Sequence, residues 1–265
     1  IKKIEIYSDQ AVYKKNEELI ITNGNSKAVS SEDNITIEGN IFKYERNKNI
    51  INAQENVVIE NEVDDYLIYS EFISFFKDQD KIITKGKTSG KIKSKYNFKS
   101  KDVTFLKKTN ELFSEKKTTV TDKYHLYNLE KFRFFIDKEQ LNGEKIIIEA
   151  NYNSPKSDKY YFSSAIIDTK NQEFIAKDTE VKVHKSIYDN TENDPRIKGV
   201  SSRKKGEIIT VDKAVFTSCK QTDSCPPWAI EAKEVEHDRN KKLVNYENAV
   251  LKLYDFPVFY FPKFF

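Results

Sequence analysis

A repeat of about thirty residues runs through the first half of the chain. In each copy an aromatic residue precedes a charged, turn-like stretch, and an aliphatic residue follows six or seven positions on. The copies run from Tyr13 to Leu19, Tyr44 to Ile50, Phe76 to Ile82, Phe105 to Leu112 and Phe135 to Leu141, and their starts are 31, 32, 29 and 30 residues apart. Weaker copies cover 167–174 and 237–243. A fixed period of this size predicts stacked units that share one core.

Each copy is predicted to form strand, turn and strand. Apolar and polar residues alternate at 34–38, 131–134 and 180–184, which is the pattern of a half-buried strand. Helical spacing is nowhere sustained for three turns. We therefore expect an all-β fold of stacked antiparallel hairpins, in which two facing sheets close into a sandwich or a flattened roll. On this pattern alone the interior is either a sealed core or an open trough.

The prolines divide the chain unevenly. All six lie at or after Pro155, so residues 1–154 contain none. Proline is excluded from central strands because it lacks the N–H that a ladder needs. We expect continuous sheets over 1–154, a boundary near Asn153–Ser154–Pro155, and a more irregular continuation over 155–265.

Composition is typical of a folded protein with a solvated surface. Aromatic residues make up 13% and the net charge is only +3, whereas disordered chains lack aromatics and carry larger net charge. Lysines alternate with acidic residues instead of clustering, so nothing indicates a nucleic-acid partner. The longest apolar run, Phe256 to Phe261, is far shorter than the ~20 residues of a membrane-spanning helix. This segment is expected to approach a membrane without crossing it.

No catalytic, metal or cofactor site is predicted. The three histidines, at 125, 184 and 237, are isolated from other metal ligands. The stretch from Gly86 to Lys91 has three residues between its glycines and Ile92 after its lysine, so it does not match a phosphate-binding loop. Carboxylates are abundant but lie on the solvated side of the alternation. The enzyme that remains an alternative is a polysaccharide-active β-solenoid lyase or hydrolase.

The two cysteines are Cys219 and Cys225, beside Pro226, Pro227 and Trp228. They are disulfide candidates, which favours an oxidising compartment. Three alternatives stay open: a bridge between them, bridges to other partners, and free thiols. A bridge closing so short a loop is worth only about 2 kcal/mol.

Five linked motifs in the C-terminal third resemble the periplasmic part of the LptD family of lipopolysaccharide-assembly outer-membrane proteins. The upstream repeat is similar to the family's OstA-type segment, so the resemblance covers most of the chain. The motifs are Asp194–Arg203, Val215–Cys219, Trp228–Ala232, Glu236–Arg239 and Asp255–Pro262.

The resemblance implies lipopolysaccharide transport without catalysis or a cofactor. It implies a β-jellyroll trough at the periplasmic face of the outer membrane of a Gram-negative bacterium. The trough would receive lipopolysaccharide from an LptA-like bridge and pass it to an outer-membrane barrel that is absent here. An LptE-like lipoprotein would join through that barrel, and Cys219 would take part in disulfides, often with barrel cysteines.

Residue roles follow as expectations. The lipid-lining candidates are Ile35, Ile37, Val57, Ile59, Phe132, Phe134, Ile146 and Ile148. The strand that contains Ile4 and Ile6 is expected to dock the bridge by β-augmentation. The barrel junction is assigned to Phe256, Pro257, Phe259 and Tyr260.

Two other classes of protein remain open, a soluble bridge protein of the same jellyroll type and a structural or adhesive surface β-repeat protein. The chain lacks Met and begins inside an alternating stretch, so we expect a processed or excised product.

Overall fold

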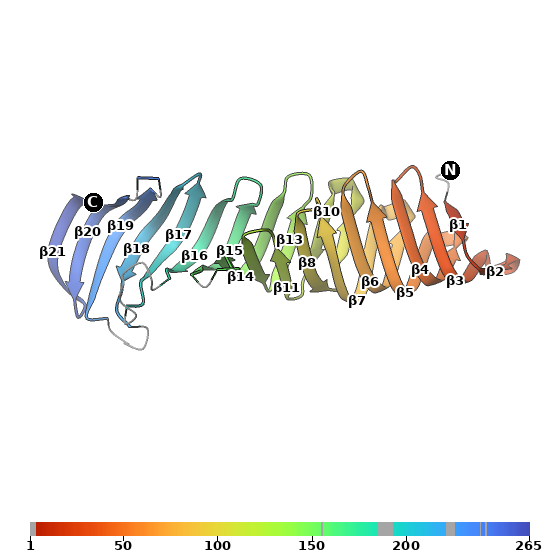
Figure 1. Cartoon of the computed structure of the whole chain (residues 1–265), viewed down its shortest axis with the longest axis horizontal. Coiled ribbons are helices and arrows are strands. Elements are labelled where there is room, and N and C mark those ends of the chain that lie inside the picture. Colours follow the sequence, from red (N-terminus) through yellow and green to blue (C-terminus); the bar gives the residue numbers. More distant parts are fainter. Residues whose placement is uncertain (1–3, 155, 185–192, 221–225, 239, 242) are drawn as a thin grey trace. The chain divides into compact units, whose positions relative to one another are not determined.

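A computed structural model describes residues 4–154, 156–184, 193–220, 226–238, 240–241 and 243–265 (Figure 1). The predicted all-β fold of antiparallel hairpins is confirmed, and within these residues the helices are single 3-10 turns. The chain divides into two compact units. Unit 1 comprises 1–123 and 131–138, and unit 2 comprises 124–130 and 139–265.

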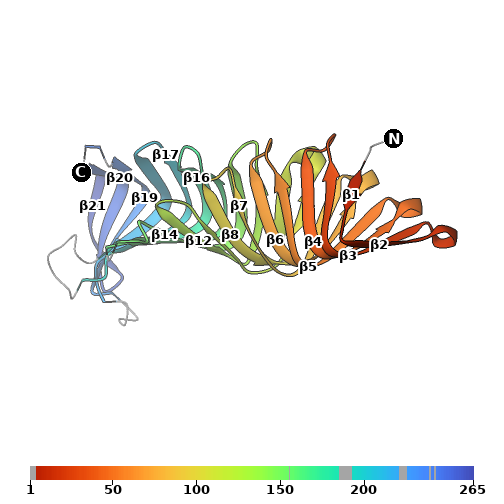
Figure 2. The same ribbon diagram turned by 45° about the vertical axis from the view of Figure 1, so that its right-hand side comes forward.

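Unit 1 is an antiparallel meander in which each long strand pairs with the next (Figure 2). Its strands are β1 (Glu5–Tyr7), β2 (Gln10–Lys14), β3 (Leu19–Ser30), β4 (Ile35–Glu45), β5 (Ile50–Asn61), β6 (Tyr66–Phe76), β7 (Lys81–Ile92), β8 (Tyr96–Lys101), β9 (Thr104–Leu106), β10 (Glu111–Ser114), β11 (Thr118–Thr121) and β13 (Lys131–Phe135). Its 3-10 turns are η1 (Lys15–Glu17), η2 (Arg46–Lys48), η3 (Lys77–Gln79) and η4 (Lys107–Thr109).

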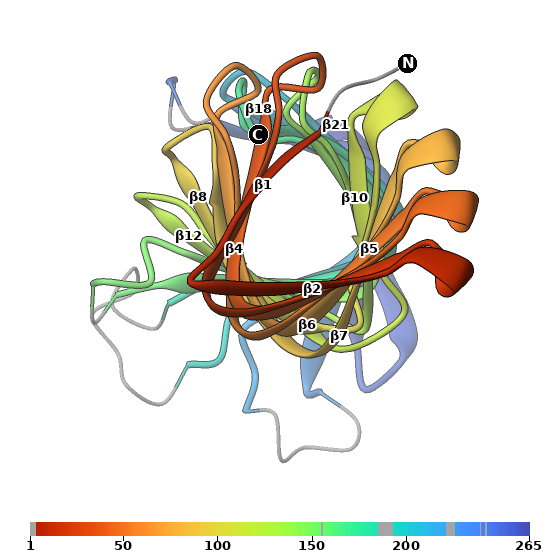
Figure 3. The same cartoon turned by 90° about the vertical axis from the view of Figure 1, so that its right-hand side faces the viewer.

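The turns explain the sequence repeat. Each 3-10 turn ends in a left-handed residue, namely Glu18, Asn49, Asp80 or Asn110, with φ between 48° and 50°. The carbonyl of each left-handed residue accepts a backbone hydrogen bond from the next turn, for example from Arg46 to Glu18 at 3.0 Å. In the same way the N–H groups of residues 77, 107 and 136 donate to the carbonyls of residues 49, 80 and 110, with N···O distances of 2.9–3.1 Å. These turns form a stack, called here the turn rim, along one side of unit 1 (Figure 3).

The long strands of unit 1 bend at β-bulges, so one strand contributes to both layers of the roll. Pairing shifts register between Asn23 and Ser26, and the same happens near the middle of β4, β5 and β6. A bulge leaves backbone groups without ladder partners. Buried hydroxyls satisfy them: Thr22 Oγ1 accepts from the Phe42 N–H at 3.2 Å, and Thr84 Oγ1 accepts from the Val103 N–H at 2.8 Å.

Large apolar side chains fill the interior of unit 1. One cross-strand row on the inner face comprises Ala28, Ile37, Ile59, Ile68, Gly90, Phe98 and Val120. The six apolar side chains of this row are at most 3% exposed. Aromatic rings from strands that do not pair also meet across the interior, such as Tyr96 and Phe134 at 5.3 Å. The alternation predicted for 34–38 and 131–134 therefore separates core from solvent as expected.

Unit 2 is a second antiparallel meander. Its strands are β12 (His125–Leu129), β14 (Gln140–Ala150), β15 (Asp158–Asp168), β16 (Glu173–Lys182), β17 (Arg196–Lys205), β18 (Ile208–Thr217), β19 (Trp228–Asp238), β20 (Leu243–Leu253) and β21 (Phe256–Phe264). Bends again occur at left-handed residues, with φ of 48° to 51° at Lys145, Asp178, Lys213 and Asn248. The prolines of the described part of unit 2 lie in connections or in β21, and the more irregular continuation over 155–265 stays a prediction.

The predicted boundary near Asn153 lies between β14 and β15, and its Pro155 lies outside the described residues. Both strands belong to unit 2, where they pair from Gln140 with Asp168 to Ala150 with Asp158. The two-domain division at 154/155 stays a prediction.

Candidate functional site

The eight lipid-lining candidates all have buried side chains. Their exposed fractions range from 0% at Ile59 to 4% at Ile148. Six lie in unit 1, and Ile146 and Ile148 lie on β14 of unit 2. Phe132 and Phe134 pack against Phe98 and Tyr96, with ring centroids 6.2 and 5.3 Å apart. Burial alone is compatible with a core or a lining, so their contact with lipid stays a prediction.

Unit 2 has a different interior from unit 1. A cross-strand row on its inner face runs through Ala214, Ala232, Ala249 and Phe261. The three alanines are at most 6% exposed, whereas Phe261 is 39% exposed. The inner row of unit 1 consists mainly of isoleucine and phenylalanine, whereas three of these four positions in unit 2 are alanine. Other apolar side chains of the unit cover this row of short side chains.

The alanine row belongs to a buried cluster with a partly exposed apolar margin. The cluster comprises Ile209, Val211, Ala214, Ala232, Val235 and Ala249. Side chains packed against it but only partly buried are Tyr160, Ile197, Ile230, Val244, Tyr246 and Phe264. An apolar surface accessible at its edges is what a fatty chain requires, because burial of each CH₂ is favourable.

The predicted barrel-junction residues lie on β21 and are exposed. Phe256, Phe259 and Tyr260 are 75%, 63% and 59% exposed, and Pro257 is exposed as well. β21 pairs with β20, with a register shift at Leu251. Exposed aromatic groups of this kind often mark interaction surfaces. Their role as a junction stays a prediction.

The predicted bridge-docking residues lie at the start of unit 1. Ile6 lies opposite Ala28 where β1 pairs with β3, and Ile4 directly precedes β1. Both side chains are partly buried. β-Augmentation at this strand stays a prediction.

Three of the family-like motifs meet at one end of β17, β18 and β19. Arg196 donates to the Cys219 carbonyl at 2.5 Å, and Thr217 Oγ1 donates to the Trp228 carbonyl at 2.8 Å. The Cys219 sulfur lies 3.7 Å from that same carbonyl, and the Phe216 ring contacts the Trp228 ring at 5.8 Å. Cys225 lies outside the described residues, so a disulfide of Cys219 or Cys225 stays a prediction.

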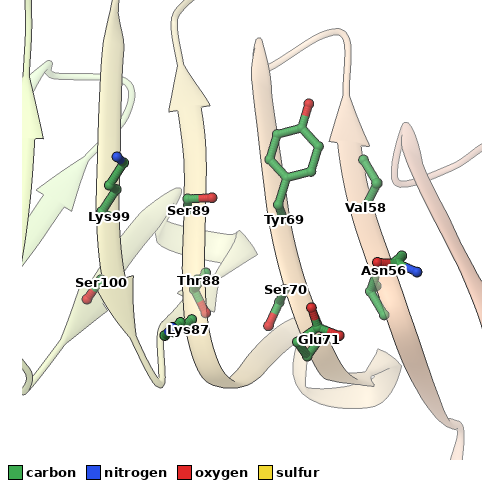
Figure 4. Close-up of a pocket in the computed structure, with 11 residues that line it drawn as sticks. Asn56, Val58, Tyr69, Ser70, Glu71, Lys87, Thr88, Ser89, Lys99 and Ser100 are labelled. Atoms are coloured by element: carbon green, nitrogen blue, oxygen red, sulfur yellow. The ribbon is translucent and has the colours of Figure 1, made fainter.

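A shallow groove of about 490 Å³ lies where β5–β8 bend (Figure 4). Val58, Tyr69, Ser89 and Lys99 form one cross-strand row along it. Tyr69 is 46% exposed, and the row lies on the opposite face of the sheet from the inner row of unit 1. Of the predicted lining residues, Val57 also borders this groove.

Candidate metal ligands do not gather in the described ranges. There, no group of three or more His, Cys, Asp or Glu residues is placed to hold a metal ion. Across the same residues, no helix has the length and hydropathy needed to cross a membrane.

Pairs of hydroxyl side chains at the bulges are a feature that the sequence patterns did not predict. Thr22 and Ser26 share a hydrogen bond of 2.6 Å across Gly24, and Thr84 and Thr88 share one of 2.7 Å across Gly86. The signal was present as two hydroxyl residues four apart around a glycine, inside an otherwise alternating strand.

Comparisons with known proteins give likenesses to solved structures. No protein-family model and no curated protein matches the chain. Among solved structures, part of the chain is similar to LptH, the LptA homologous periplasmic component of the lipopolysaccharide transport device from Pseudomonas aeruginosa. The TM-score is 0.38 at 13% identity, over 42% of this chain and 80% of LptH. A likeness this distant carries no argument about function.

Proposed function

We propose that this chain is a lipopolysaccharide carrier that shields acyl chains along the apolar inner face of its rolled sheet. It acts at the periplasmic face of the outer membrane of a Gram-negative bacterium. It receives lipopolysaccharide from an LptA-like bridge at β1 and passes it to an outer-membrane barrel that an LptE-like lipoprotein accompanies. The support for these partners is the resemblance of the motifs between Asp194 and Pro262 to the LptD family.

The observation that carries the proposal is the alanine row of unit 2 with its partly exposed margin. Transfer of an acyl chain of ~12 carbons out of water is worth on the order of 10 kcal/mol, at about 0.8 kcal/mol per methylene. A carrier therefore needs a continuous apolar surface that its own side chains do not fill. Ala214, Ala232 and Ala249 form an apolar row across three neighbouring strands, and the partly buried side chains that border their cluster are where an acyl chain would make first contact.

Photo-crosslinking on the purified chain tests this proposal. A photoreactive residue replaces Ile230, which packs on the buried cluster while partly exposed. A second replaces Ile146, which is 1% exposed on the inner face. The matched control is Ile175, an isoleucine of the same unit that is 68% exposed. After irradiation with lipopolysaccharide, the adduct is detected by gel shift and immunoblot.

Capture at Ile230 and Ile146, with little at Ile175, is the expected result. Equal capture at all three positions would indicate non-specific adsorption to exposed apolar groups. Absence of capture at the two inner positions, under conditions where a known lipopolysaccharide binder is labelled, would defeat the carrier function. Turnover of a polysaccharide by the chain would favour the enzyme alternative instead.

A further inference from the structure

The two ends of the long strands of unit 1 meet, although each strand spans most of the roll. One end is the turn rim. The other comprises the loops after β3 and β5, residues 31–34 and 62–65, called here the hairpin rim. A strand of 11 or 12 residues is about 36–40 Å long. A flat sheet would hold the rims that far apart, so their contact requires the sheet to curl back on itself.

Polar side chains make that contact. Lys107 of η4 forms an ion pair with Asp33 of the β3–β4 loop, at 2.6 Å between Nζ and Oδ1. The two side chains are only 13% and 6% exposed. Beside them, Asn110 donates to the carboxylates of Asp64 at 3.3 Å and Asp137 at 2.8 Å. These five residues are called here the seam.

An apolar layer lies directly beneath the seam. The ring of Tyr66, the first residue of β6, meets the Phe105 ring edge-on at 4.9 Å between centroids. The Lys107 ammonium lies over the Phe75 ring at 5.5 Å. Phe75 and Phe105 are 1% and 2% exposed and belong to the core. Separation of the rims would therefore uncover the interior of unit 1 from this side.

The seam differs from every other closure of unit 1 in what holds it. Neighbouring strands are joined by ladders of backbone hydrogen bonds, and the turn rim by bonds between successive turns. Across the seam, the contacts of Lys107 with Asp33 and of Asn110 with Asp64 join side chains. One of these groups is imperfectly satisfied, since the buried Asn110 Oδ1 has no hydrogen-bond partner among the described residues. A buried ion pair is also a poor source of net stability, because water solvates both charges once they separate.

We propose that the seam is a latch, which opens the rims of unit 1 so that an acyl chain enters its interior from the side. The inference rests on the proposed carrier function. A latch would reconcile the predicted lipid contact of Ile35 and Ile37 with their burial, since both follow Asp33 on the same hairpin and each is 1% exposed. When the latch is closed these side chains contact protein, and when it opens they move with the hairpin and face the entering chain.

Thiol labelling measures the opening without lipid. Cys219 and Cys225 are replaced by Ser, and Ile37→Cys supplies a reporter inside unit 1. Lys107→Met removes the charge from the seam and keeps the length of the side chain. We expect it to raise the maleimide labelling rate about tenfold or more, because local opening controls access to a buried thiol. Asp33→Asn, which preserves side-chain size, should do the same.

The matched control is the exposed ion pair on the outer face of the same hairpin. Lys27 lies 2.8 Å from Glu38, and the two side chains are 46% and 52% exposed. Lys27→Met should leave the labelling rate unchanged. Circular dichroism shows whether each variant is folded. Labelling in both folded seam variants at the rate of the Lys27 control would overturn the latch, whether or not the chain binds lipid.

Lipopolysaccharide supplies the second arm of the experiment. If acyl chains enter through the seam, lipopolysaccharide should slow labelling of Cys at position 37, and more so in the Lys107→Met chain. Faster labelling in the seam variants without such protection would overturn the route for acyl chains, even if photo-crosslinking shows lipid in unit 2. Failure of crosslinking at Ile230 and Ile146 would instead defeat the carrier function itself.

Discussion

The hydroxyl of Thr84 holds together a bend of unit 1, and its removal has a cost that the structure defines. Thr84 Oγ1 accepts the Val103 N–H at 2.8 Å, and Val103 is 1% exposed. Thr84→Val keeps the shape of the side chain and opens no cavity. It leaves the Val103 N–H buried without its acceptor, because the register shift at the bulge supplies no other.

A buried donor left unsatisfied costs about 1–3 kcal/mol. Loss of the hydrogen bond between Thr84 and Thr88 adds to this, so we expect the free energy of unfolding to fall by about 2–3 kcal/mol. Thr88→Val is the matched control within the same pair. Thr88 Oγ1 donates to the Gly86 carbonyl at 3.3 Å, and that carbonyl also accepts from the Asp102 N–H. This control strands no buried donor and should cost about 1 kcal/mol or less.

Urea unfolding, followed by circular dichroism and by tyrosine fluorescence, measures both variants. The slope against urea concentration should stay the same if only native stability changes. Thr22→Val should repeat the result of Thr84→Val, because Thr22 accepts the Phe42 N–H at the equivalent bend. Equal losses for Thr84→Val and Thr88→Val, or losses below about 0.5 kcal/mol for both, would refute the idea that these hydroxyls replace ladder bonds.

Three further variants test the core, the pH response and the lining. Burial raises the pKa of Tyr66 above its ordinary value of 10.0, so the unfolded chain loses this proton first and stability falls as pH rises above about 10. Tyr66→Phe should therefore flatten the fall of the unfolding free energy between about pH 9 and 11, measured by urea unfolding at each pH, and an unchanged slope would contradict this. Gly90→Ala would place a Cβ 2.4 Å from the Leu67 carbonyl oxygen, and we expect a loss of about 2–4 kcal/mol in thermal or urea unfolding. Ala232→Trp places a large ring in the alanine row and should reduce lipopolysaccharide crosslinking at Ile230 and Ile146, whereas Lys233→Trp on the exposed face should not. Equal effects of the two variants would argue against a lipid path along the alanine row.

Local patterns predicted the strands well. The alternation around Ile35 and Ile37 placed both side chains on the inner face, where they are 1% exposed. The aromatic-to-aliphatic spacing of Tyr44 and Ile50 marked the strands on either side of η2. Such signals are readable because a strand turns its side chains to opposite faces at every step. Pro257 fits the rule as well, since it lies in β21 rather than in a central strand.

Long-range closure was not readable from the same patterns. Asp33 and Lys107 are ordinary surface charges in the sequence, and only the curl of the sheet brings them together. The contrast between filled and methyl-lined rows was also missed, because Ala232 and Ile59 are both simply apolar in a binary pattern. The bends escaped notice for a related reason. At the bend of β5, Glu55 and Asn56 both have positive φ, and every second residue is buried on either side of them, so the alternation does not mark the bend.

The stack of turns makes the length of unit 1 a matter of copy number. Each turn is hydrogen-bonded to the one before it, so neither neighbour depends on where the stack stops. Duplicating residues 50–80 would add two strands and extend the meander by about 9–10 Å, at ~4.8 Å per strand. A protein built this way can be fitted to a gap of almost any width by gain or loss of whole copies, with no redesign of the contacts inside them.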